Sequence, residues 1–208
     1  MSTQAQSPFP PGFAITTTRL RIVPFDPDNE EHTKFLARLW NTEQFIKSCG
    51  ATGIKDAASA AKFIRNRVLS DYEYQKHGIF LVLLYDEETK TITPIGTASL
   101  MKGRPPGAHY LAPDIGYAIL PEMNGKGYAT EASKGLIDYA RTELGIEGVF
   151  GFCDSKNMHS RRVLEKIGLD FRGIAELTVF GNALSAVYTL PGMNQDLGVY
   201  GLTETLQQ

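Results

Sequence analysis

A glycine-rich turn at residues 124–130 is the part of this sequence best suited to binding a charged ligand. It runs Asn-Gly-Lys-Gly-Tyr-Ala-Thr, after an apolar segment that ends at Leu120 and before a segment with helical spacing. Small residues let a ligand approach the backbone, and N–H groups at the start of a helix attract anions, most often phosphate. Lys126 adds a positive charge, and the Thr130 hydroxyl can donate a hydrogen bond. The turn therefore predicts a phosphate-bearing ligand.

Two common phosphate-binding motifs do not fit this turn. The P-loop requires GxxxxGK[ST], but Gly127 follows Lys126 here, and Leu120 holds the place of the first glycine. The dinucleotide motif requires GxGxxG, and Thr130 stands where its third glycine would be. A plain tight turn, which needs glycine only for its backbone geometry, stays open as an alternative.

The segments around the turn predict the elements that position it. The pattern of residues 114–120 indicates a strand, and a helix is expected over 128–144. Residues 102–113, with three prolines and two glycines, are expected to form a loop. Other strands are expected at 14–25, 79–85, 94–101, 148–154, 171–180 and 183–190, and other helices after Asn29, from Asp56 and over 160–167. Strands that cluster in mid-chain, without strict alternation with helices, indicate a mixed α+β fold.

The length of the chain fits one domain with short ends. A chain of 208 residues buries about 70% of its unfolded surface without help from a metal or a disulfide. Residues 1–13 contain three prolines and little to bury, so we expect a flexible N-terminal arm. The domain itself is expected over residues 14–190, and residues 191–208 are expected to form a C-terminal tail.

Charge and cysteine content argue against several classes of protein. The 21 Lys and Arg against 23 Asp and Glu give a net charge of −2, whereas proteins that coat nucleic acid or anionic membranes are clearly basic. Cys49 and Cys153 cannot form a disulfide framework, and the four histidines lack metal-site spacing. The apolar run over residues 79–85 is too short to span a bilayer. We therefore expect a cytoplasmic monomer or homodimer with no metal, no nucleic-acid partner and no membrane partner.

Three segments carry motifs of a known family. Residues 124–129 are similar to the signature Q/R-x-x-G-x-G/A, and residues 157–169 are similar to N-x-x-S-x-x-V-L-E-K-x-G-F. Thr-Arg-Leu-Arg-Ile-Val-Pro-Phe, at 18–25, is similar to an opening strand. Together these motifs resemble the GNAT acetyltransferases, most of all the branch of ribosomal-protein N-terminal acetyltransferases. The resemblance covers residues 16–190 and implies a splayed, mostly antiparallel central sheet with flanking helices.

The resemblance implies acetyl-CoA as acyl donor and assigns the residues that would hold it. The coenzyme A pyrophosphate would lie on the backbone of the glycine turn, and pantetheine would lie along the preceding strand. Asn157 matches the family asparagine that hydrogen-bonds pantetheine, although a helix N-cap is an alternative or additional role. The basic stretch 156–172 would attract the 3′-phosphate or form a solvated helix face. The implied cofactor-binding residues are Tyr117, Ala118, Ile119, Asn124, Gly125, Lys126, Gly127, Tyr128, Ala129, Thr130 and Asn157.

Acetyl transfer from a thioester to an amine has three physical requirements, which are loss of a proton from the amine, stabilisation of the oxyanion and stabilisation of the leaving thiolate. By resemblance, Ser160 would hydrogen-bond the departing sulfur, because Leu164 occupies the place of the usual tyrosine. Asp114 matches an acidic position of the branch and is the candidate base, acting through water; Phe152 stands where other members place a glutamate. The alternatives are a helix-capping serine and an ordinary strand-end aspartate.

The resemblance therefore implies an N-acetyltransferase that works by direct attack in a ternary complex. Its acceptor would be a protein N-terminus or a small-molecule amine. A non-catalytic acyl-CoA-binding regulatory module would share the fold and the cofactor motifs, so it remains an alternative. A nucleotide-binding or phosphate-binding domain of unrelated fold would share only the glycine turn.

Overall fold

The structure, a computed structural model, describes residues 7–103, 109–202 and 204–206. Contacts divide the chain into two compact units. Unit 1 consists of residues 1–99 and 117–136, and unit 2 consists of residues 100–116 and 137–208. Three elements run through both units: β4 (Ile92–Gly103), β5 (His109–Ile119) and α5 (Tyr128–Leu144). In the described part of the chain, none of the helices is both long and apolar enough to cross a membrane.

The sheet of unit 1 is antiparallel from β1 to β4. The hydrogen-bonded order is β1 (Ile15–Thr16), β2 (Leu20–Pro24), β3 (Ile79–Tyr85) and β4. In β2, Leu20 and Ile22 are buried while Arg21 is exposed, as the alternation in the sequence predicts. Phe80, Leu81 and Val82 are all buried, which confirms β3 as a strand covered on both faces.

A close approach between β4 and β5 in unit 1 depends on a glycine. A Cβ atom at Gly96 would lie 2.4 Å from the carbonyl oxygen of Ala118 and 2.5 Å from the Ile119 side chain. Any side chain at residue 96 would therefore push β5 away from β4. The end of β5 that leads into the glycine turn is thus held tightly against the sheet.

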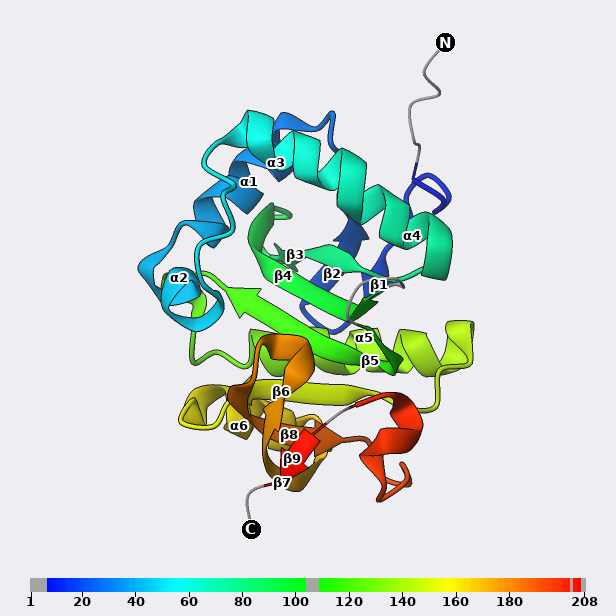
Figure 1. Ribbon diagram of the computed structural model, residues 1–208. Helices are drawn as coiled ribbons and strands as arrows, with labels where there is room; N and C mark the ends of the chain where they lie inside the picture. The colour runs from blue at the N-terminus through cyan, green and yellow to red at the C-terminus, as the bar shows by residue number, and fades with distance from the viewer. Residues whose placement is uncertain (1–6, 104–108, 203, 207–208) are drawn as a thin grey trace. The chain divides into compact units, whose positions relative to one another are not determined.

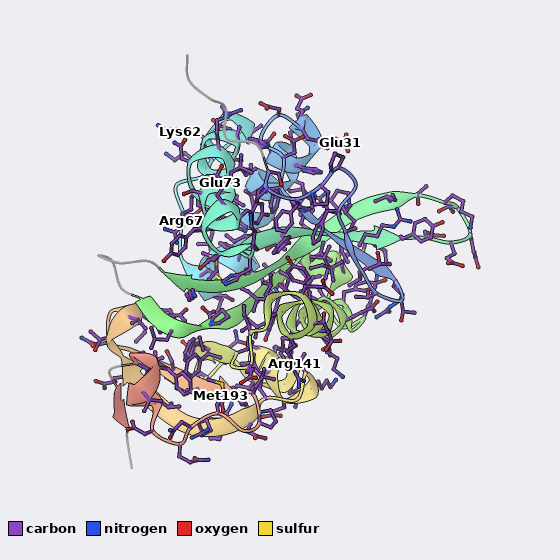
Figure 2. All side chains as sticks on the ribbon, turned by 90° about the vertical axis from the view of Figure 1, so that its right-hand side faces the viewer. Glu31, Lys62, Arg67, Glu73, Arg141 and Met193 are labelled. Atoms are coloured by element: carbon purple, nitrogen blue, oxygen red, sulfur yellow. The ribbon has the colours of Figure 1, made fainter. Side chains whose placement is uncertain are left out.

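The helices of unit 1 are α1 (Glu30–Trp40), α2 (Glu43–Cys49), α3 (Ala57–Phe63) and α4 (Leu69–Gln75), with a π-helical turn at Ile64–Val68 between the last two. Asn29 and Asp56 cap α1 and α3, as their sequence positions predict. Figure 1 shows α1, α3 and α4 together beside β2, β3 and β4. Lys62 and Glu73 are exposed side chains of this helical layer and are labelled in Figure 2.

Unit 2 contains the remaining strands and one further helix. Its strand order is β5, β6 (Phe150–Asp154), β8 (Ala183–Thr189), β7 (Asp170–Leu177) and β9 (Glu204–Leu206). β5 pairs with β6 in parallel at Asp114 and Phe150, and the other pairs are antiparallel. Helix α6 (Met158–Lys166) packs on β6 where Gly151 leaves room, since a Cβ there would lie 2.5 Å from Leu164.

Residues on both sides of the domain predicted over 14–190, in the segments predicted as arm and tail, make contacts that the sequence did not indicate. In unit 1, Phe9 stacks on Phe13 at 4.5 Å between ring centroids and meets the edge of Tyr72 at 5.1 Å. In unit 2, Met193 and Leu197 are buried, and Figure 2 labels the first of them. The domain boundaries remain predictions.

The prediction of a loop over residues 102–113 is wrong at both ends that the structure describes. β4 extends to Gly103, and β5 begins at His109, while residues 104–108 lie outside the described part of the chain. The prolines of this segment suggested a loop, but one of them, Pro113, lies within β5. A strand accepts a proline wherever a neighbouring strand does not need the missing N–H.

Several other predicted boundaries also differ. The strand expected over 14–25 is the two paired strands β1 and β2, and β6 begins at Phe150. Helix α6 begins at Met158, and β7 ends at Leu177 before a short 3-10 turn.

Candidate active site

The glycine turn has the backbone geometry that its sequence indicates. Gly125 and Gly127 have φ angles of +76° and +83°, in the left-handed region that side chains rarely adopt. Helix α5 begins immediately afterwards at Tyr128, and its first N–H groups have no partners within the helix. A Cβ at Gly127 would meet the guanidinium of Arg19 at 3.5 Å. The turn thus ends in a helix N-terminus suited to an anion.

Two polar side chains of the turn contact neighbouring elements of unit 1. The amide nitrogen of Asn124 donates a hydrogen bond to Gln44 Oε1 of α2 at 2.8 Å. The ammonium group of Lys126 lies 3.6 Å from the sulfur of Met123, and its side chain is exposed. The predicted site residues Tyr117, Ala118 and Ile119 form the end of β5 that leads into this turn.

An ion pair beside the turn was not foreseen from the sequence. Glu131, in the first turn of α5, accepts hydrogen bonds from Thr17 Oγ1 at 2.6 Å and from the backbone nitrogen and Nε of Arg19, both at 2.7 Å. Burial alone would raise the pKa of Glu131, but these hydrogen bonds outweigh it, so the pKa lies below its usual value. Thr18-Arg-Leu-Arg is similar to the family's opening strand, but no sequence spacing connects it to residue 131.

In unit 2, Asp114 lies on β5 beside an aromatic cluster. The hydroxyl of Tyr110 donates a hydrogen bond to its carboxylate, and the Tyr110 ring meets Phe150 and Phe152 edge to face, at 6.1 Å and 5.8 Å. Burial raises the pKa of Asp114 to about 6, although the hydrogen bond from Tyr110 acts in the opposite direction. Burial also raises the pKa of Tyr110, which stays protonated. A carboxylate with this pKa can accept a proton near neutral pH.

Asn157 and Ser160 lie together at the start of α6, also in unit 2. Asn157 is the N-cap, and its Oδ1 accepts a hydrogen bond from the Ser160 backbone nitrogen at 3.1 Å. The side chain of Ser160 is hydrogen-bonded to the thiol of Cys153. Burial raises the pKa of Cys153 to about 11, against the effects of Ser160 and Arg161, so the thiol is protonated. Such a thiol is a poor nucleophile.

The basic stretch 156–172 is partly engaged within unit 2. Arg161 Nε donates to the Tyr188 hydroxyl at 3.0 Å, and its guanidinium lies 4.7 Å from the centre of the Phe171 ring. Arg172 donates to Thr189 and Gln195. Two of the five basic side chains are therefore held by contacts within the unit, which leaves fewer of them free to reach toward a ligand.

Within each unit the structure brings some of the predicted site residues together. The turn and residues 117–119 belong to unit 1, whereas Asp114, Asn157 and Ser160 belong to unit 2. Along β5, two residues lie between Asp114 and Tyr117. Among the described residues there is no group of three or more His, Cys, Asp or Glu side chains that could hold a metal ion.

Comparison with known proteins decides the family. A family model described as an acetyltransferase (GNAT) domain matches residues 19–170, well over half of the chain. The chain belongs to the GNAT acetyltransferase family. The resemblance found in the sequence motifs is thereby confirmed, and a phosphate-binding domain of unrelated fold is excluded.

One curated relative of this GNAT protein is the putative ribosomal N-acetyltransferase YdaF of Bacillus subtilis. It is 30% identical over 147 residues, which cover 69% of this chain and 71% of YdaF. Matches to two other N-acetyltransferases of Bacillus subtilis, one uncharacterized and one described as probable, are shorter. They span only 35% and 36% of the length of those relatives.

Solved structures confirm the GNAT fold. The ribosomal-protein-S5-alanine acetyltransferase of Vibrio fischeri has a TM-score of 0.67 at 15% identity, covering 89% of this chain and 98% of its own. RimL, the acetyltransferase of ribosomal L7/L12, was solved with coenzyme A and has a TM-score of 0.65 at 16% identity, covering 85% and 97%. The predicted mixed α/β fold with a mostly antiparallel sheet and flanking helices is therefore confirmed.

Proposed function

We propose that this GNAT protein is an N-acetyltransferase that uses acetyl-CoA as acyl donor and an amine as acceptor. The observation that carries the proposal is the glycine turn. Gly125 and Gly127 both adopt left-handed backbone conformations immediately before the N-terminus of α5. Coenzyme A is rich in phosphate, which fits a helix N-terminus bordered by small residues, and RimL was solved with coenzyme A.

The residues of the turn and of β5 would hold this donor. Backbone N–H groups from Gly125 to Thr130 would bind the pyrophosphate, with Lys126 adding positive charge nearby. The backbone of residues 117–119 would pair with pantetheine, and an N–H there would stabilise the oxyanion. Acetyl-CoA, when bound, supplies an acetyl group activated as a thioester. No covalent enzyme intermediate is needed, because positioning two substrates together provides much of the rate.

Three side chains of unit 2 fit the remaining chemical requirements. Asp114 would accept the proton of the amine, directly or through water, and its pKa of about 6 leaves it mostly ionised at neutral pH. The Ser160 hydroxyl would hydrogen-bond the departing sulfur. Asn157 would donate its Nδ2 hydrogens to pantetheine, because its Oδ1 is already used as the helix cap.

The descriptions of the relatives support a choice of acceptor class to test. YdaF is described as a putative ribosomal N-acetyltransferase, and the Vibrio fischeri structure is described as a ribosomal-protein-S5-alanine acetyltransferase. We therefore propose a protein N-terminus as the first acceptor to test and a small-molecule amine as the second. A non-catalytic acyl-CoA-binding module is less well supported, because Asp114 has a raised pKa that suits proton transfer.

An acceptor screen with acetyl-CoA tests the proposal. Peptides that begin with Ala or Ser, the same peptides with acetylated N-termini, and a set of small amines are incubated with protein and acetyl-CoA. Free coenzyme A is then detected by its thiol. We expect release with an unblocked amine and none above background with its blocked partner. A rise in melting temperature with acetyl-CoA, but no turnover with any amine, would support the binding module instead.

A further inference from the structure

We propose that Arg19 is a positioning residue for the glycine turn, and that it prepares the N-terminus of α5 to receive phosphate. The inference rests on the proposed function, because it assumes that this turn binds the phosphates of coenzyme A. It assigns a task to an ion pair whose two partners are 112 residues apart in the chain. All of the residues involved belong to unit 1.

The guanidinium of Arg19 contacts the chain on both sides of Gly127. Its Nη1 donates to the carbonyl oxygen of Lys126 at 3.1 Å, and its Nε and Nη2 each lie 2.7 Å from Glu131 Oε2. Its central carbon is 4.5 Å from the centre of the Tyr128 ring. One rigid, planar group therefore joins the turn, the first residue of α5 and the first turn of that helix.

The contact with Lys126 fixes the direction of a backbone N–H group. In a trans peptide the carbonyl of one residue and the N–H of the next point in opposite directions. Because Arg19 binds the Lys126 oxygen, the N–H of Gly127 must point away from Arg19. Without this hydrogen bond, the peptide that joins Lys126 to Gly127 would be freer to rotate, because a glycine such as Gly127 tolerates φ angles of either sign. Arg19 thus orients one of the donors that the proposed pyrophosphate site requires.

The contact with Glu131 neutralises a charge that would oppose phosphate binding. A carboxylate in the first turn of α5 stabilises the helix but repels an anion at the same N-terminus. Glu131 is only 17% exposed, so water screens its charge poorly, and Arg19 supplies the compensating charge at 2.7 Å. Loss of Arg19 alone would leave this carboxylate beside the phosphates.

The next arginine in the chain provides a matched control. Arg21, on β2, also lies over a tyrosine ring, with its central carbon 4.9 Å from the centre of Tyr85. Arg21 is exposed, and its strand belongs to the sheet of unit 1. Arg19 and Arg21 thus share charge, size and an aromatic contact, but the bonds to Lys126 and Glu131 belong to Arg19.

Calorimetric titration with coenzyme A, combined with acetylation kinetics, tests the inference. The variants are Arg19→Met, Arg19→Lys, Arg21→Met and the double variant Arg19→Met/Glu131→Gln. We expect Arg19→Met to weaken coenzyme A binding at least about tenfold, and Arg21→Met to stay within about twofold of the wild type. Arg19→Lys keeps the positive charge but lacks the planar set of guanidinium donors. Its affinity for coenzyme A should therefore lie between those of Arg19→Met and Arg21→Met. KM for acetyl-CoA should rise more than kcat falls.

The double variant separates positioning from simple loss of stability. Removing the Glu131 charge should restore part of the affinity that Arg19→Met loses, which gives a positive coupling in the double-mutant cycle. A purely structural role predicts the opposite, because the double variant loses more contacts than the single one. If Arg19→Met does not fold, the comparison of Arg19→Lys with the wild type decides, and equal affinity for coenzyme A overturns the inference.

The outcomes also separate this inference from the proposed function. If wild-type protein binds coenzyme A and Arg19→Met binds it equally well, the positioning role is wrong and the proposed function stands. If wild-type protein does not bind coenzyme A at all, the proposed function is wrong and the role of Arg19 falls with it.

Discussion

The hydroxyl of Tyr110 donates a hydrogen bond to the carboxylate of Asp114, four residues further along β5. Burial of this carboxylate and the hydrogen bond that it accepts act on its pKa in opposite directions, and burial has the larger effect. The pKa therefore rises from an ordinary value of 3.8 to about 6. The candidate base thus titrates within a pH range where enzymes are readily assayed, so its role is open to direct test.

The first prediction concerns Tyr110→Phe. Only the ionised form of Asp114 can accept a proton, so kcat/KM should rise with pH through about 6 and then level off. The hydrogen bond from Tyr110 stabilises the ionised form, and its loss should move this acid limb to higher pH. A pH profile of both proteins measures the shift. Tyr139→Phe, on α5, is the control and should leave the limb in place; an unmoved limb in Tyr110→Phe would contradict the prediction.

The second prediction concerns Asp114→Asn. Turnover should fall much more than affinity for acetyl-CoA, because the variant removes the base and leaves the turn intact. The folded state raises the pKa of Asp114, so protonation favours folding: this contribution is complete below pH 3.8 and is lost as pH rises through about 6. The neutral asparagine avoids that loss. Melting temperatures of both proteins at pH 5 and pH 8 should show a larger relative gain for the variant at pH 8.

The third prediction concerns Gly127→Glu. The new side chain would place a negative charge in the turn and force a residue with a Cβ into a φ of +83°. Acetyl-CoA should then fail to raise the melting temperature. Gly145→Glu is the control, because Gly145 has a φ of +64° and open space around its Cβ position, at the other end of α5. A normal thermal shift in Gly127→Glu would show that the phosphates bind elsewhere.

The fourth prediction separates the two polar residues at the start of α6. Asn157→Ala removes the N-cap and should lower the free energy of unfolding by about 1 kcal/mol, as well as weakening acetyl-CoA binding. Ser160→Ala leaves the cap in place, so stability should change little while kcat falls. Urea unfolding and steady-state kinetics of both variants provide the comparison. Equal losses of stability would mean that Ser160 has a mainly structural role.

The fifth prediction concerns the core of unit 1. The hydroxyl of the fully buried Tyr72 accepts a hydrogen bond from the Phe25 backbone nitrogen at 3.2 Å and donates one to the carbonyl of Ile79. Tyr72→Phe leaves both backbone groups without this partner and should cost about 1–3 kcal/mol of unfolding free energy. Tyr74→Phe, two residues later and 61% exposed, should cost little. Denaturant titrations of both variants measure the difference.

Strong periodicity made much of the fold predictable from the sequence. The strand at 79–85 and the helix at 128–144 have the predicted bounds, because an apolar run and a regular helical stripe leave little ambiguity. Helix α2 was missed, since all of its residues are at least partly exposed and it shows no apolar stripe. It stays in place partly through the stacking of Phe45 on Trp40, at 5.2 Å, which is a tertiary contact.

The candidate site was predictable only where its residues are adjacent in the chain. Gly125 and Gly127 were expected to adopt special conformations, and the structure shows them. The bond from Arg19 to Glu131 could not be foreseen, because it depends on how the first strands pack against α5. The bond from Tyr110 to Asp114 was missed for another reason: both residues lie on β5, but residues 102–113 were expected to form a loop. Hydrophobic pattern indicates which faces are buried, but it carries no information on which polar side chains meet across them.

The glycine beneath α6 has a consequence for anyone who wishes to re-engineer this protein. Because Gly151 has no side chain, the leucines beside α6 pack directly on the β6 backbone. A methyl group there would lie 2.5 Å from Leu164 and 2.8 Å from Leu169. A larger residue would first displace the ends of the Leu164 and Leu169 side chains, and one too large for them to accommodate would shift α6 and Ser160 with it. A displacement of about 1 Å in a reacting group can cost on the order of a hundredfold in rate. A library that varies only the surface residues of the candidate site would leave out residue 151, which sets the spacing between α6 and β6.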